Sequence, residues 1–373
     1  MHRKEGRKGL LPVVCTGLTF LHQQILRQFG LRPKKRLGQH FLVDEAVLDC
    51  ILSAAELSHG DIVVEIGPGL GILTEGLAKR GAKVIAVELD SRLVTLLRKR
   101  LSSLPDVRVV HGDILKLSPE ELLAGDLPAS ELDRGYRVIA NLPYYITSPV
   151  LRHFLEGGAR PSRMVVMVQK EVGEAIAASP GKMSLLSVKI QFYSRPTIMA
   201  HVAAASFYPP PKVESVVLRL EVYSQAPIEV SDVASFFEVV MRGFSSPRKQ
   251  LHNSLAHSLE MPPGEVAALL EKAGIEAKRR AETLGLEEWR ELWRVFAPCL
   301  PRPEPSASCH PEPSEGPCNP QGKFRKGEDP GPSQDRHREG SRRSPSTGSG
   351  HAPVAEFTPN EAQARPQNDL SGE

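Results

Sequence analysis

The sequence predicts an α/β fold, with a mostly parallel sheet and helices on both faces, followed by a small all-helical C-terminal domain. Up to about residue 222, short apolar runs alternate with segments of helical spacing, which is typical of a parallel sheet. From residue 228 to about 298 only helical spacing remains, punctuated by Pro262-Pro263, Gly274 and Gly285. The 373 residues are enough for two domains and a substantial core.

Each expected strand is a short apolar run that ends at polar or turn-forming residues. The expected strands are residues 62–65, 83–88, 107–111, 137–140, 163–168 and 213–220, with another near 190–193. The expected helices are residues 72–79, 233–244, 248–259, 264–273 and 286–296. The sequence therefore predicts a first domain over residues 31–222 and a second over residues 228–298.

Both ends of the chain differ in composition from these two domains. Residues 1–30 form a variable basic extension, and residues 1–40 hold nine Lys and Arg against one acid, which suits a polyanion such as RNA. In residues 301–373, Pro, Gly and Ser account for 30 of 73 residues, and no apolar period survives. Such a tail cannot bury enough surface to offset the entropy of ordering, so we expect it to be disordered.

Cysteine usage and hydropathy exclude several classes of protein. The five cysteines are odd in number and lack metal-ligand spacing, so we expect a reducing compartment, no disulfide framework and no metal site. The apolar run over residues 10–21 superficially resembles a secretion signal, but it is too short to span a bilayer and no small-residue cleavage site follows. We expect a cytoplasmic protein without membrane association; an organelle transit peptide stays open.

A Gly-rich turn follows the first expected strand, in Glu65-Ile66-Gly67-Pro68-Gly69-Leu70-Gly71. Glycines let the backbone approach a ligand where a Cβ would clash. The next strand ends in Glu88, where an acidic side chain can hold both hydroxyls of a ribose. The third ends at Asp113, whose carboxylate can accept from an adenine amine. Up to this point a dinucleotide-binding dehydrogenase also fits, and the glycines alone fit a structural turn.

Asn141-Leu142-Pro143-Tyr144 follows the fourth expected strand and gives the pattern its specificity. Glu65, Glu88, Asp113 and Asn141 are separated by 23, 25 and 28 residues, each about one βα unit, so they recur at strand carboxyl ends, where open α/β sheets bind ligands. An Asn side chain and a main-chain carbonyl can both accept from an exocyclic amine, and a Tyr can stack on its ring. Taken alone, the stretch also fits a purely structural turn. A dinucleotide-binding dehydrogenase would have no use for these four residues, so they argue against that alternative.

This ordered set resembles the class I S-adenosylmethionine-dependent methyltransferases, whose domain is Rossmann-like. Further motifs narrow the resemblance to the ribosomal RNA adenine dimethyltransferases, over about residues 34–296. These motifs are Lys35-Arg36-Leu37-Gly38-Gln39-His40-Phe41-Leu42-Val43-Asp44, Gln169-Lys170-Glu171-Val172, Phe207-Tyr208-Pro209-Pro210-Pro211-Lys212-Val213-Glu214-Ser215, Arg248-Lys249 and Asn253-Ser254-Leu255. The helical second domain and Leu142 favour the small-subunit enzymes (KsgA/RsmA type) over the large-subunit enzymes that confer macrolide resistance.

The resemblance implies dimethylation of the N6 amine of two adjacent adenosines near the 3′ end of 16S rRNA during small-subunit biogenesis. It implies S-adenosyl-L-methionine as cofactor, an RNA-binding helical domain, and a monomer whose partner is 16S rRNA in the small ribosomal subunit or its precursor. Two alternatives remain: a 23S rRNA adenine N6-methyltransferase, and a non-catalytic RNA-binding assembly factor on the same fold. Carried over from the family motifs, the cofactor contacts are His40, Leu42, Gly67, Glu88, Asp113 and Asn141.

The expected catalytic residues are Asn141, Leu142, Tyr144 and Phe207. The Asn141 side chain and the Leu142 carbonyl would bond the amine hydrogens, so that the nitrogen lone pair points at the sulfonium methyl for in-line displacement. The target base must leave its stack, and Tyr144 and Phe207 would cover its two faces. Phe207 has an alternative as a core aromatic beside Pro209-Pro210-Pro211.

Three positions depart from the family pattern, and all three concern binding. His40 stands where the family often has Asn, so the contact there holds only through main chain or a single donor. Pro247 stands where the family usually has another basic residue, and His252 where it often has Arg, and both changes weaken a local basic patch. The candidate phosphate contacts are Lys34, Lys35, Arg36, Arg195, Lys212, Arg242, Arg248 and Lys249, although a surface cation is often only solvated.

Overall fold

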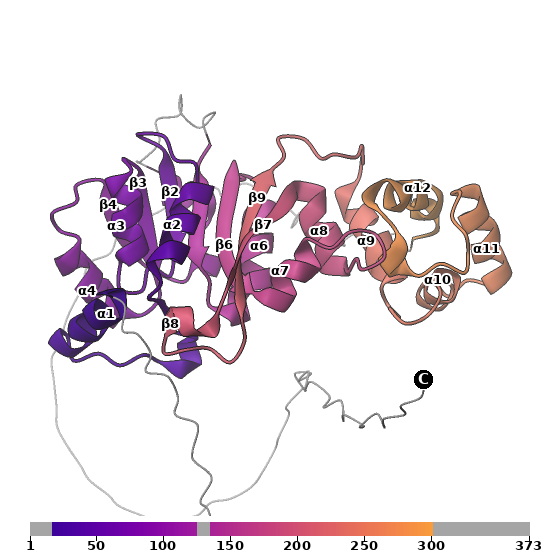
Figure 1. The fold of residues 1–373 in the computed structure, drawn as a ribbon. Helices are drawn as coiled ribbons and strands as arrows, with labels where there is room; N and C mark the ends of the chain where they lie inside the picture. The colour runs from indigo at the N-terminus through magenta and orange to yellow at the C-terminus, as the bar shows by residue number, and fades with distance from the viewer. Residues whose placement is uncertain (1–16, 125–134, 301–373) are drawn as a thin grey trace, which may run out of the picture. The chain divides into compact units, whose positions relative to one another are not determined.

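The structure is a computed structural model that describes residues 17–124 and 135–300 (Figure 1). The predicted disorder of residues 301–373 and the basic residues before residue 17 lie outside the described residues. Among the residues described, no helix has the length and apolar character needed to cross a membrane.

Seven strands form the central sheet, in the order β4-β3-β2-β5-β6-β9-β7. The strands are β2 (Ile62–Ile66), β3 (Lys83–Glu88), β4 (Val107–His111), β5 (Arg137–Asn141), β6 (Arg163–Gln169), β7 (Ser194–Val202) and β9 (Ser215–Val222). The first five strands in this order run parallel, and β9 and β7 add antiparallel pairs at one side. The predicted α/β fold with a mostly parallel sheet is confirmed.

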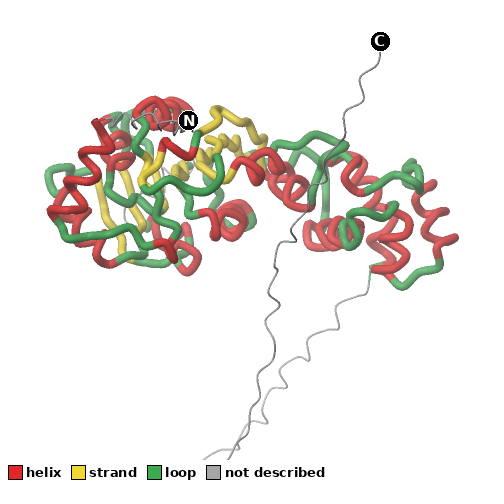
Figure 2. Tube along the Cα trace, turned by 60° about the horizontal axis from the view of Figure 1, so that its bottom comes forward, coloured by secondary structure: helices red, strands yellow, loops and turns green. Residues whose placement is uncertain are grey.

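Helices cover both faces of this sheet because successive strand residues point to opposite sides (Figure 2). Val63 packs in one cluster with Ile51 of α2 and Leu77 of α3, whereas Val64 packs in another with Phe154 of α6. The helices up to β7 are α1 (Gly17–Gln28), α2 (Glu45–Ala54), α3 (Ile72–Lys79), α4 (Ser91–Arg100), α5 (Pro119–Leu123), α6 (Thr147–Leu155), α7 (Lys170–Ile176) and α8 (Leu185–Tyr193).

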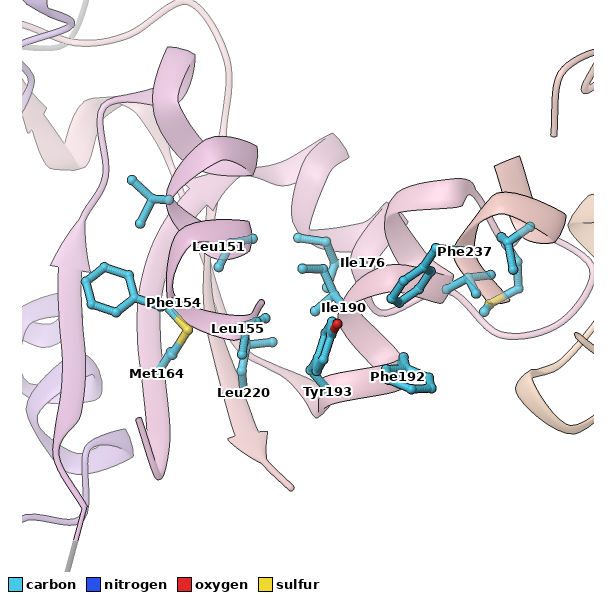
Figure 3. Packing of buried hydrophobic residues seen from close by; sticks show 14 of the residues in the cluster. Leu151, Phe154, Leu155, Met164, Ile176, Ile190, Phe192, Tyr193, Leu220 and Phe237 are labelled. Carbon is cyan, nitrogen blue, oxygen red and sulfur yellow. The ribbon is translucent and has the colours of Figure 1, made fainter. Parts of the chain in front are cut away.

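Helices alone follow β9 among the described residues. They are α9 (Val233–Gly243), α10 (Leu251–Leu259), α11 (Pro263–Lys272) and α12 (Leu286–Phe296). Phe192 of α8 lies 5.2 Å, ring to ring, from both Phe236 and Phe237 of α9, so one apolar cluster continues from the sheet into these helices. Figure 3 shows the sheet end of this cluster, where Phe154 and Leu155 of α6 pack near Met164 of β6. The division into domains at residues 222 and 228 stays a prediction.

Two segments differ from the sequence prediction. Residues 190–193 end helix α8 instead of forming a strand, and the strand begins only at Ser194. A reciprocal cap starts α8, since Ser184 and Ser187 each accept a hydrogen bond from the other's backbone N–H. Strand β7 lies at the edge of the sheet and contains Pro196, which is unusual in a strand and makes it hard to predict from the sequence.

Helix α1 is the second difference, because residues 17–28 were expected to belong to a variable extension. Its buried Ile25 and Leu26 pack with Leu93 and Leu97 of α4 and with Phe41. The buried residues of this helix, Thr19, His22, Ile25 and Leu26, recur three or four positions apart, which is the spacing of one helix face.

A small second sheet brings together two segments that are far apart in the sequence. Strand β1 (Phe41–Leu42) pairs antiparallel with β8 (Phe207–Tyr208), with Leu42 opposite Phe207. Asp44 extends this link, because its carboxylate caps α2 and also accepts from the Ser206 hydroxyl at 2.8 Å. The pairing fixes β1 at the edge of the cavity described next.

Candidate active site

A cavity of about 320 Å³ lies at the carboxyl ends of the parallel strands. Gly67 follows β2, Glu88 ends β3, Asp113 follows β4 and Asn141 ends β5, and all four line this cavity. His40, Leu42, Leu142 and Tyr144 line it as well. The structure therefore brings together every residue expected to contact the cofactor, at the edge where α/β sheets bind ligands.

The Gly-rich turn lines one side of the cavity. Gly67 and Gly69 have φ values of +65° and +59°, which residues with a side chain rarely adopt. A Cβ at Gly69 would lie 3.1 Å from the ring of Phe41, so glycine is also needed for packing. The turn thus keeps its backbone close to whatever fills the cavity.

Glu88 presents a nearly buried carboxyl group, 7% exposed. Its Oε1 accepts from the Asp90 N–H at 2.9 Å and its Oε2 from the Gly69 N–H at 3.4 Å, which fixes its orientation. Burial raises the pKa of Glu88, partly offset by these backbone bonds. A carboxyl group held in this way can accept hydrogen bonds from two vicinal hydroxyls.

Asp113 begins the turn after β4. Its Oδ1 accepts from the Leu115 N–H at 3.1 Å, and the structure describes no partner for its Oδ2 within residues 17–124 and 135–300. One oxygen thus orients the side chain, and the other remains available to a donor such as an adenine amine.

Asn141 has its amide oriented by a main-chain group. Its Nδ2 donates to the His40 carbonyl at 3.0 Å, which leaves Oδ1 free to accept. The next residue, Leu142, is 1% exposed, and its N–H donates to the Met167 carbonyl at 3.2 Å. The described part of the chain offers no donor to the Leu142 carbonyl. Two acceptors therefore stand at adjacent positions of the cavity wall.

Tyr144 and His40 stack beside this pair of acceptors. Their ring centroids lie 6.1 Å apart with an interplanar angle of 18°. The Tyr144 hydroxyl bonds to Ser215 Oγ at 2.7 Å, and His40 Nδ1 donates to the Pro209 carbonyl at 2.6 Å. His40 thus contributes its main-chain carbonyl to Asn141 and its ring to Tyr144, so its departure from the usual Asn does not disrupt this wall.

Phe207 is placed differently from the predicted stacking wall. It is 3% exposed and packs with Val47 and Ile51 of α2, and the cavity walls, as far as the structure describes them, do not include it. Its pairing with Leu42 turns the ring into the core beneath β1. In this conformation Phe207 is the core aromatic that the sequence offered as an alternative.

Glu65, which the sequence pattern places near a strand end but which is not among the expected cofactor contacts, lines the cavity and is 1% exposed. Its Oε2 has no hydrogen-bond partner among the described residues. Burial, with a smaller contribution from the Glu88 charge, raises the pKa of Glu65 to about 8, while the nearby Thr74 hydroxyl opposes the rise. An acidic residue within an otherwise apolar strand is the sequence feature that could have assigned Glu65 to the cavity.

Asp90 links the segment from Lys34 to Gln39 to helix α4. Its carboxylate is bound by Arg92 at 2.8 Å and by Lys34 at 3.1 Å, and Gln39 Nε2 donates to it at 3.4 Å. The Arg92 hydrogen bonds contribute most to holding the pKa of Asp90 below its usual range. The segment from Lys34 to Gln39 is thereby held across the cavity mouth, where Gly38 and Gln39 line the wall.

The predicted phosphate contacts divide into two groups. Lys34 is paired with Asp90, and Arg242 is paired with Glu238 at 2.7 Å. The exposed members are Arg36, Arg195, Lys212, Arg248 and Lys249. In the residues described, no group of three His, Cys, Asp or Glu has the geometry of a metal site.

Comparisons with known proteins agree with this geometry. The model of the ribosomal RNA adenine dimethylase family matches residues 30–297. A protein of Dehalococcoides mccartyi named "Ribosomal RNA small subunit methyltransferase A" is 46% identical over 293 residues, covering 77% of this chain and 98% of that protein. A protein of the same name from Moorella thermoacetica is 43% identical, covering 73% of this chain and 95% of that protein.

Two solved structures have similar folds. A dimethyladenosine transferase from Plasmodium falciparum has a TM-score of 0.59 at 26% identity, covering 70% of this chain and 98% of that one. The 23S rRNA methyltransferase ErmE has a TM-score of 0.56 at 27% identity, covering 68% of this chain and 98% of that one.

Proposed function

Because the chain belongs to the ribosomal RNA adenine dimethylase family, we propose that it dimethylates the N6 amines of two adjacent adenosines near the 3′ end of 16S rRNA. The chain is a methyltransferase on a class I Rossmann-like fold, and its named relatives act on the small ribosomal subunit. We place its activity in small-subunit maturation, in the cytoplasm, on the subunit or its precursor.

The orientation of the Asn141 amide is the observation that carries this proposal. Its Nδ2 is occupied by the His40 carbonyl, so Oδ1 and the Leu142 carbonyl are two acceptors without a described donor. An adenine amine has two N–H donors and a lone pair delocalised into the ring. Accepting both hydrogens favours a pyramidal nitrogen whose lone pair is directed outward, and much of the rate follows from this positioning.

The residues of the cavity fit S-adenosyl-L-methionine. The Glu88 carboxyl group can accept hydrogen bonds from the ribose hydroxyls, and Asp113 Oδ2 can accept one from the adenine amine. The main chain of the glycine turn can lie close to the bound ligand. When bound, the cofactor supplies a methyl group on a sulfonium. Asn141 and Leu142 then hold the acceptor nitrogen, and Tyr144 offers one face for stacking of the base.

Phe207 would have to move before it could serve as the second stacking face, because it does not line the cavity within the described residues. The ring would have to leave its contacts with Val47 and Ile51 to reach a base. Tyr144 is held by Ser215 and His40, so it needs no such movement.

The large-subunit alternative rests on the similarity to ErmE, at 27% identity. The relatives named for the small subunit are 43–46% identical over more of the chain, which favours 16S rRNA. A non-catalytic assembly factor would not need the oriented Asn141 amide or the carboxyl groups of Glu88 and Asp113.

Methyl transfer to unmodified 30S subunits, followed by nucleoside analysis, tests the function. We expect N6-dimethyladenosine in 16S rRNA, and we expect Asn141→Ala to lower the rate by roughly 100-fold or more, since one of two acceptors is lost. Gln24→Ala, which removes an exposed amide on α1, serves as the matched control. Product in 23S rRNA would favour the large-subunit alternative, and an Asn141→Ala protein with full activity would contradict the mechanism.

A further inference from the structure

Helix α1 supplies part of the cavity wall, although it lies before the residues matched by the family model. The family match begins at residue 30, whereas His22, in the middle of α1, lines the cavity. Ile25 and Leu26 anchor the helix on Leu93 and Leu97 of α4, and Figure 1 shows α1 beside α4. The helix is therefore positioned by an apolar contact that is independent of the histidine.

The ring of His22 is fixed in one orientation. It is 2% exposed and stacks on Phe41, with centroids 6.2 Å apart and an interplanar angle of 23°. Nδ1 lies 2.6 Å from the Leu18 carbonyl one turn earlier, and because a carbonyl only accepts, Nδ1 carries the hydrogen. Burial lowers the pKa of His22, the hydrogen bond to Leu18 opposes this shift, and the Arg100 charge adds to it, so the net lowering favours the neutral ring.

A neutral imidazole with the hydrogen on Nδ1 has an unprotonated Nε2. Nε2 is thus a hydrogen-bond acceptor, and within residues 17–124 and 135–300 the structure describes no donor for it. A nearly buried acceptor on the wall of a ligand cavity favours a ligand group that donates hydrogen bonds.

If the proposed cofactor is right, the other residues of the cavity indicate which of its donor groups is left for His22. S-adenosylmethionine carries three kinds of donor: the adenine amine, the ribose hydroxyls and the α-ammonium. Asp113 suits the first and Glu88 the second. His22 stacks on Phe41, which packs with Leu70 of the Gly-rich turn after β2.

We propose that Nε2 of His22 accepts a hydrogen bond from the α-ammonium of the cofactor, so that helix α1 is part of the cofactor site. Glu65 lines the same cavity and adds a carboxyl group to its wall. This inference rests on the proposed function, but it concerns cofactor binding alone and can be tested without RNA.

Calorimetric binding of two compounds separates the ammonium from the rest of the cofactor. S-adenosylhomocysteine carries the amino-acid group, and methylthioadenosine lacks it. His22→Phe keeps a ring to stack on Phe41. We expect this substitution to lower the affinity for S-adenosylhomocysteine about 10-fold and to change the affinity for methylthioadenosine less than two-fold. We expect His22→Gln, which offers an oxygen near the position of Nε2, to restore most of the lost affinity.

The controls keep structural effects apart from binding. Phe20 is 58% exposed on the same helix, so Phe20→Ala should leave both affinities unchanged. An S-adenosylhomocysteine affinity in His22→Phe within two-fold of the unsubstituted protein would overturn the inference, as would an equal loss for both compounds, which would indicate packing alone. If the unsubstituted protein bound neither compound, the proposed function itself would fail.

Discussion

Single residues decide the charge inside the cavity, and Glu65 is the clearest case. It is a carboxyl group on the buried strand β2, next to its last residue, and its Oε2 has no described partner. Burying a carboxylate without a partner is costly, so the group binds a proton instead. Two nearly buried carboxyl groups, Glu65 and Glu88, thus share one cavity, and a cationic ligand would favour ionisation of both.

The pKa of Glu65, about 8 in the folded protein, makes stability depend on pH. Because this pKa lies above the unfolded value, the folded protein binds more protons between about pH 4.5 and pH 8, and its stability falls as pH rises through that window. We expect Glu65→Gln to remove this loss. The gain over the unsubstituted protein should grow from pH 5 to pH 9 and reach on the order of a few kcal/mol, measured by urea unfolding without cofactor.

An exposed carboxyl group provides the matched control for that measurement. Glu265 is exposed on α11, so Glu265→Gln should give a difference that stays constant over the same pH range. A constant difference for Glu65→Gln as well would show that Glu65 is ionised in the folded protein.

Packing between elements depends on small residues at close contacts, as at Gly173 of α7. A Cβ there would lie 2.2 Å from Val216 Cγ2 of β9 and 3.3 Å from Val168 Cγ2 of β6. We expect Gly173→Ala to lower the unfolding free energy by about 1–3 kcal/mol, because overpacking outweighs the better helix propensity of alanine. Thermal or urea unfolding measures this change.

Gly264 of α11 is the matched control for Gly173, because a Cβ there would meet no atom within 4 Å. Gly264→Ala should be neutral or raise the unfolding free energy by up to about 1 kcal/mol. Equal effects of the two substitutions would contradict the close contact between α7 and the sheet.

At the scale of elements, much of the fold could be predicted from the sequence. β3, β4, α3 and α12 have the predicted boundaries, because each apolar period ends at polar or turn residues on both sides. The strand predicted near residues 190–193 is wrong, because a four-residue segment with three apolar side chains fits the last turn of a buried helix equally well. Only tertiary packing separates the two.

The same limit applies to the candidate site. The positions of Glu88, Asp113 and Asn141 followed from one βα interval each, which places their side chains at one edge of the sheet. The sequence could not predict the surroundings of Phe207 or His22. Strand β8 turns Phe207 into the core, and the packing of α1 on α4 brings His22 to the cavity. Such directions depend on contacts between segments far apart in the sequence.

The whole molecule carries a formal net charge of only +3, so its distribution of charge matters more than its sum. Several predicted phosphate contacts are occupied inside the protein, as Lys34 is by Asp90 and Arg242 by Glu238. Arg248 and Lys249, before α10, are exposed, and the structure describes no ion pair for either within residues 17–124 and 135–300. These two cations are therefore available to RNA phosphates.

Salt dependence of binding to 30S subunits tests this distribution. Each phosphate contact releases counterions and contributes about 0.7–0.9 to the slope of log affinity against log salt. We expect Arg248→Ala with Lys249→Ala to weaken binding and to reduce the slope by roughly 1 to 2. Lys79→Ala with Arg80→Ala removes the same charge from the exposed end of α3 and should leave the slope unchanged. Equal reductions in both variants would mean that net charge, and not contact at the start of α10, governs the attraction to RNA.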